Sequence, residues 1–120
     1  MSGVTQVNFL KVRNNVDFRY VLPFTQADGT TPLDLSGSTF RMDVVPKVGS
    51  TTPILSLSLG SGLAFYTDGT DGKLMIDVDK AVMKVKTPGS YKYDIVMTTG
   101  TVDVTLAEGT IKIKAGVTDV

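Results

Sequence analysis

Acidic side chains gather in one short segment, Asp68-Gly69-Thr70-Asp71-Gly72, and Asp77 and Asp79 follow it closely. Oxygen ligands spaced along a loop are the donors that calcium prefers. The spacing does not match an EF-hand loop, and the nonapeptide repeat of calcium-binding β-solenoids is missing from the sequence. The alternative is a tight turn in which Gly supplies a positive φ and Asp bonds its own backbone. We favour the turn and expect no metal site, with calcium binding by the Asp68 to Asp71 loop as the open alternative.

Catalytic chemistry has few other candidates in this sequence. There is no His and no Cys, which removes the commonest general base and every Ser-His or Cys-His nucleophile pair. Paired carboxylates could still run glycoside hydrolysis. The sole Glu, Glu108, sits beside a predicted turn, and most Asp residues also cluster at turns. We therefore expect no enzyme activity, no catalytic residues and no cofactor.

The charge balance argues against several partners. Twelve Lys and Arg offset twelve Asp and Glu, and the basic residues are scattered, so no basic patch for nucleic acid is expected. Residues 1–10 lack the pattern of a cleaved signal, and no apolar run approaches the roughly 18 residues of a membrane span. We expect no nucleic-acid partner, no membrane partner and no small-molecule substrate.

Alternation of apolar and polar residues with period two dominates the rest of the chain and predicts short, half-buried strands. In Ser90 to Thr99, for example, Tyr91, Tyr93, Ile95 and Met97 share one face. The predicted strands lie in residues 16–24, 38–45, 54–59, 73–78, 90–99, 102–106 and 109–115. A turn at Glu108-Gly109 makes the last three a meander.

The aromatic residues allow two interpretations. They could form a platform on which sugars stack, but most occupy inward positions of alternating strands and there is no Trp, which favours a core role. The aromatic residues of the chain are Phe9, Phe18, Tyr20, Phe24, Phe40, Phe65, Tyr66, Tyr91 and Tyr93.

One segment breaks the β pattern. Asp79 is placed to cap one or two helical turns, and Pro88-Gly89 ends them. The prediction is an all-β, immunoglobulin-like β-sandwich of seven or eight strands with one short helix near residues 79–85. At 120 residues the chain forms one domain, with residues 1–15 as an N-terminal arm or edge strand and residues 16–120 as the sandwich.

A series of motifs carries a family resemblance. They are residues 28–37 (DGTTPLDLSG), 71–76 (DGKLMI), 88–94 (PGSYKYD), 108–113 (EGTIKI) and 116–118 (GVT). In this order they resemble small immunoglobulin-like virion domains of tailed bacteriophages, including baseplate upper proteins and the N-terminal domains of tail-fibre proteins. The resemblance covers roughly residues 16–118, and such domains bring no catalytic residues.

The resemblance implies a structural virion protein, made in the host bacterial cytoplasm, that assembles with other virion proteins and with copies of itself. Neck, tail, baseplate and fibre attachment point are all open positions. The expected contact elements are exposed strand edges and the segment Met1 to Asn15, because an unpaired edge can accept a strand from a neighbour. The alternatives are a capsid decoration protein and a host-surface or glycan-binding module that uses Tyr66 and Asp68.

Overall fold

The computed structural model of the chain describes residues 5–26, 28–47, 49 and 52–118. Residues 1–4 of the predicted arm and residues 119–120 lie outside the described part. The described residues form an all-β protein with nine strands and one short helix. The elements are β1 (Thr5–Gln6), β2 (Phe9–Arg13), β3 (Phe18–Pro23), β4 (Thr39–Val45), β5 (Leu55–Leu59), β6 (Gly62–Phe65), β7 (Lys73–Val78), α1 (Lys80–Met83), β8 (Gly89–Thr99) and β9 (Val102–Lys114).

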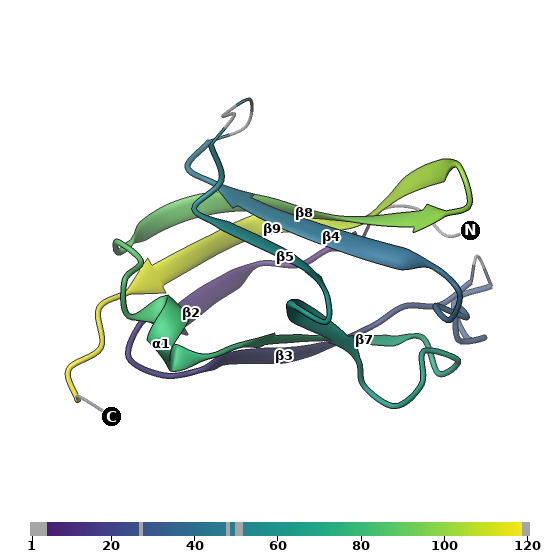
Figure 1. Cartoon of the computed structure of the whole chain (residues 1–120), viewed down its shortest axis with the longest axis horizontal. Coiled ribbons are helices and arrows are strands. Elements are labelled where there is room, and N and C mark those ends of the chain that lie inside the picture. Colours follow the sequence, from purple (N-terminus) through teal and green to yellow (C-terminus); the bar gives the residue numbers. More distant parts are fainter. Residues whose placement is uncertain (1–4, 27, 48, 50–51, 119–120) are drawn as a thin grey trace.

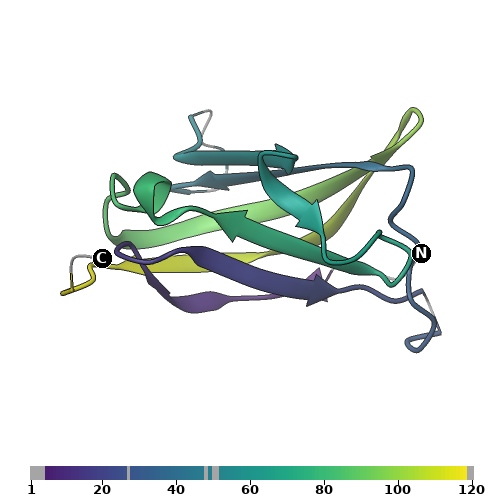
Figure 2. The ribbon, with the colours of Figure 1, turned by 60° about the horizontal axis from the view of Figure 1, so that its bottom comes forward.

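The strands follow one hydrogen-bonded path, in the order β1-β9-β8-β4-β5-β6-β7-β3, and β2 also pairs with β9. Most neighbours are antiparallel, but β1 and β2 run parallel to β9, and β5 runs parallel to β6. The path bends back at the short β5–β6 pairing, so β7 and β3 lie opposite β9, β8 and β4 (Figures 1 and 2). The sheet is therefore rolled into a nearly closed, barrel-like shape.

The core fills the space between the two sides of this roll. The predicted inward face of β8 is confirmed, since Tyr91, Tyr93, Ile95 and Met97 are all buried. Tyr20 is the exception among the inward positions of β3, with 46% of its surface exposed. Other core residues are Phe9, Val12, Phe18, Leu22, Phe24, Leu35, Phe40, Met42, Val44, Leu55, Leu57, Leu63, Leu74, Ile76, Val78, Met83, Leu106, Ala107, Ile111 and Ile113.

The C-terminal third is a two-stranded hairpin, and the predicted three-strand meander is wrong. β8 and β9 pair from one end of β8 to the other, with no turn at Glu108-Gly109. The register shifts beside Ile95, where Leu106 is an extra residue in β9. This bulge moves the inward side of β9 from even to odd positions, so Leu106 and Ala107 are both buried. The switch of apolar residues from even to odd positions in the sequence therefore lies inside one strand and does not mark a turn.

Gly109 has a different role from the predicted turn. A Cβ atom on this residue would lie 2.0 Å from the carbonyl oxygen of Val7. The missing side chain lets the N-terminal segment approach β9 closely, and the Val7 N–H donates to the Glu108 carbonyl (3.1 Å).

The strand count is nine rather than seven or eight because three short strands have weak sequence patterns. β6 has only four residues, and β1 and β2 lie in the segment that the sequence offers as an arm or an edge strand. Phe9 and Val12 of β2 are buried in the same core as the rest of the protein. Residues 5–13 are thus edge strands of this sheet.

The predicted helix is confirmed in a shorter form, Lys80–Met83. The Asp79 side chain caps it by accepting a hydrogen bond from the Ala81 N–H (3.3 Å), and Met83 anchors it in the core. Within the described ranges, no helix has the length and apolar character needed to cross a membrane.

Candidate functional site

The acidic loop considered for calcium uses its carboxylates to hold its own turn. Asp68 Oδ1 accepts hydrogen bonds from the Thr70 N–H (3.0 Å) and hydroxyl (2.6 Å), and these bonds lower the pKa of Asp68. Asp71 Oδ1 accepts from the Lys73 N–H (3.1 Å). No group of three or more acidic side chains in the described part of the chain is placed to hold a metal ion. The geometry is that of the predicted turn.

Tyr66, the residue considered for glycan binding, is 55% exposed. The ammonium group of Lys73 lies 5.4 Å from the centre of its ring. A cation over one face of the ring occupies a surface on which a sugar would stack.

Three carboxylates form a row across the outer face of the sheet, which the sequence did not reveal. Asp94 of β8 lies directly opposite Asp43 of β4 on one side and Glu108 of β9 on the other. Desolvation raises the pKa of Asp94, and the charges of Asp43 and Glu108 raise it further. The row places like charges side by side, an arrangement that destabilises a sheet.

A groove between β2 and β3 is a largely apolar concave feature of the described surface. β2 pairs only with β9, and β3 pairs only with β7, so one edge of each strand is free of strand partners among the described residues. The strands meet at the turn between them and spread apart away from it (Figure 1). We call the space between them the seam groove; it has a volume of about 470 Å³ and is lined by residues 8–13 and 16–20.

Aromatic side chains form the floor of the seam groove. The Phe9 ring packs edge-on against Phe18 (5.4 Å between ring centres) and Tyr20 (4.9 Å). Leu10, Val16 and Tyr20 leave 48%, 42% and 46% of their surfaces exposed along its walls. Exposed apolar side chains that share one hollow make it a candidate binding surface.

Behind Phe9, Tyr93 fixes the approach of the N-terminal segment. Its ring lies 5.5 Å from that of Phe9, and its hydroxyl donates to the Val7 carbonyl (2.6 Å). Burial raises the pKa of the Tyr93 phenol, so the group keeps its proton and this hydrogen bond.

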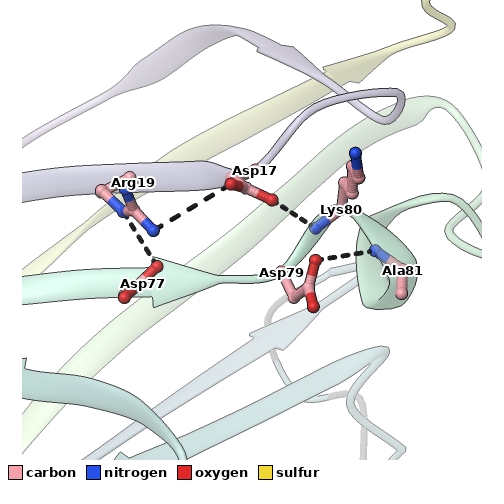
Figure 3. A network of polar contacts seen from close by, with 6 residues as sticks. All are labelled: Asp17, Arg19, Asp77, Asp79, Lys80 and Ala81. Carbon is pink, nitrogen blue, oxygen red and sulfur yellow. Dashed lines mark hydrogen bonds and ion pairs between the residues drawn. The ribbon is translucent and has the colours of Figure 1, made fainter. Parts of the chain in front are cut away.

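A polar network holds the closed end of the seam groove in place (Figure 3). Asp17, in the turn between β2 and β3, accepts a hydrogen bond from the Lys80 N–H (2.7 Å) at the start of α1. Arg19 of β3 donates to Asp77 of β7 (3.0 Å), the residue directly opposite. Its guanidinium also lies 4.0 Å from Asp17. These contacts therefore connect β3 and the turn before it, which form one side of the seam groove, to β7 and α1.

The free edge of β3 presents regular main-chain hydrogen-bonding groups. The Phe24 N–H donates to the Gly72 carbonyl (2.7 Å), continuing the β3–β7 ladder by one position. Because hydrogen-bonded pairs alternate along an antiparallel ladder, the N–H and C=O groups of Arg19 and Val21 point away from β7. Pro23, which has no N–H, occupies the next such position, as proline does on edge strands.

The free edge of β2 is less regular. Its register against β9 shifts between Phe9 and Val12, which marks a bulge at Leu10-Lys11. Lys11 and Arg13 are exposed and form no ion pair with any described residue. Together with Arg19, they give the lining of the seam groove three positively charged residues, against one negatively charged residue, Asp17.

The sequence did not identify the seam groove because the groove arises from two strand edges that pair with no other described strand. Its one local signal is the pair Phe9-Leu10, where two apolar neighbours cannot both face the core of a regular strand. Comparisons of the sequence with protein-family models and with curated proteins find no match.

Proposed function

We propose that this protein is a structural protein of a tailed-bacteriophage particle that acts through protein–protein contacts. The observation that carries the interaction role is the seam groove, where exposed apolar side chains lie between two strand edges that have no strand partner in the described part of the chain. An edge of this kind is a template for pairing with another chain. The placement in a virion rests on the sequence resemblance to immunoglobulin-like virion domains.

The strand order supports the immunoglobulin-like part of this proposal. In that description β2, β9, β8, β4 and β5 form one sheet, β6, β7 and β3 form the other, and the β5–β6 crossing joins them. Immunoglobulin domains likewise place strands C, F and G in one sheet and strands B, E and D in the other, but their strand A joins the latter sheet, whereas β2 pairs with β9.

Immunogold labelling of purified phage particles, made from the genome that encodes this chain, tests the placement. We expect label at one fixed position, which would also distinguish neck, tail, baseplate, fibre attachment point and capsid. Unlabelled particles from cells that express the chain would refute the virion role. Unassembled precursor fractions from the same lysate provide the control for antibody access.

Light scattering on the purified chain over a range of concentrations tests the predicted self-association. A closed oligomer of defined mass is the expected result if copies of the chain contact one another symmetrically. A strict monomer would refute self-association and leave other virion proteins as the partners.

A further inference from the structure

We propose that the free edge of β3 binds an extended segment of a partner protein as an added strand in the seam groove. The segment alternates apolar side chains, which face the groove floor, with acidic side chains, which face solvent between the two rims. This inference rests on the proposed function and specifies the chemistry of the partner.

The main-chain groups of β3 supply the pairing. Arg19 and Val21 direct N–H and C=O groups away from β7, and these groups bond no other main-chain group in the described part of the chain. An added strand would satisfy them with the ladder geometry that β7 already uses on the other side. β3 is the better template of the two rims because its six pairs with β7 show no register shift, whereas β2 is bulged.

The groove floor supplies the apolar contact. Side chains of an added strand alternate between its two faces, so every second residue would point toward Phe9 and Tyr20. Those residues would cover the exposed parts of Leu10, Val16 and Tyr20. A segment with apolar residues at every second position meets this requirement.

The rims supply the charge preference. Lys11 and Arg13 stand on the β2 side without ion-pair partners among the described residues, whereas Arg19 on the β3 side is already paired with Asp77 and Asp17. Acidic residues on the outer face of the added strand would lie beside Lys11 and Arg13. A second copy of this chain fits less well, because a two-fold symmetric contact brings the same cation-rich patch against itself.

The test uses the full chain, labelled with ¹⁵N, and a soluble peptide of about eight residues that alternates valine and glutamate, a length that spans β3. A peptide that alternates valine and lysine is its matched control. We expect the glutamate peptide to shift the resonances of β2 and β3 and to slow amide exchange at Arg19 and Val21. Salt weakens the binding, and the lysine peptide binds at least roughly fivefold more weakly.

Two pairs of variants separate backbone pairing from charge. Val21→Pro removes an N–H that points away from β7 and should abolish binding, while Val21→Thr keeps that N–H and should retain it. Lys11→Glu should weaken binding roughly threefold. Lys92→Glu makes the same charge change at an exposed position of β8, which β9 separates from β2, and should leave binding unchanged.

The proposal is wrong if the glutamate peptide does not bind at millimolar concentration, if both peptides bind equally, or if the protected amides lie on another strand. The immunogold result separates this failure from failure of the proposed function. Labelled particles with no peptide binding would refute strand addition alone. Peptide binding with unlabelled particles would refute the virion role and retain the binding edge.

Discussion

The β8–β9 hairpin and the seam between β2 and β3 join chain neighbours in opposite ways. β8 and β9 are long strands connected by a tight turn at Gly100, and their main chains pair throughout. β2 and β3 are also consecutive strands with a short connection, but they pair with different partners and meet only through side chains. Proximity in sequence therefore does not decide pairing here. The buried aromatic residues hold the seam together while its main-chain groups stay available.

Truncating one apolar side chain in each region should give the largest contrast. Ile95→Ala, at a fully buried site on β8 of the hairpin, should lower the free energy of unfolding by about 3 kcal/mol because it leaves a cavity. Tyr20→Ala, at a half-exposed site in the seam groove, should cost about 1 kcal/mol. Urea unfolding measures both. Equal losses would mean that the seam is packed as tightly as the paired face.

Gly109→Ala should separate the N-terminal strands from β9. The new Cβ would meet the Val7 carbonyl oxygen at 2.0 Å, so the main chain of one strand must move. We expect a loss of about 2 kcal/mol, with faster exchange of the Val7 amide. Gly100→Ala is the control: it adds a Cβ in open space at a positive φ, so it should cost about 1 kcal/mol and leave the Val7 amide protected. Unchanged exchange at Val7 in Gly109→Ala would contradict this account.

Asp94→Asn should give the smallest effect, and a stabilising one. The pKa of Asp94 is raised in the folded protein, so the folded state binds the proton more tightly than the unfolded state does. The stability that Asp94 contributes is therefore greatest at low pH. It is lost as the pH rises from the pKa of Asp94 in the unfolded state through its higher pKa in the folded state. At pH 7 the variant should be more stable by only about 0.5 kcal/mol, because Asp94 is exposed and solvent screens its repulsion by Asp43 and Glu108.

The pH dependence of that gain is its check. Urea unfolding of both proteins near pH 3 should show no difference, because Asp94 is protonated there in both states. A gain of the same size at both pH values would mean that charge repulsion in the carboxylate row is not its cause.

Local patterns in the sequence predicted the parts of the fold that depend on local physics. The inward face of β8 and the Asp79 cap of α1 follow from alternation and from capping chemistry, and both are found in the structure. The continuity of β9 was missed because a bulge and a turn produce the same change of phase at Leu106.

The seam groove and the carboxylate row were missed for a different reason. Asp43, Asp94 and Glu108 become neighbours only through the register of three strands. The free edge of β3 depends on which strands do not pair, and no single segment of the sequence encodes that. These features belong to the tertiary arrangement.

The parallel pairing of the N-terminal strands with β9 also has a kinetic consequence. Thr5 pairs with Ala107 and Phe9 with Ile111, so these contacts close loops of about a hundred residues. Contacts of high sequence separation form slowly, because the entropy of loop closure is lost before the contact is gained. On the ribosome, the first strands must wait for the last one to emerge. The β2 rim of the seam groove therefore takes its place late, and a nascent chain has no finished groove to offer.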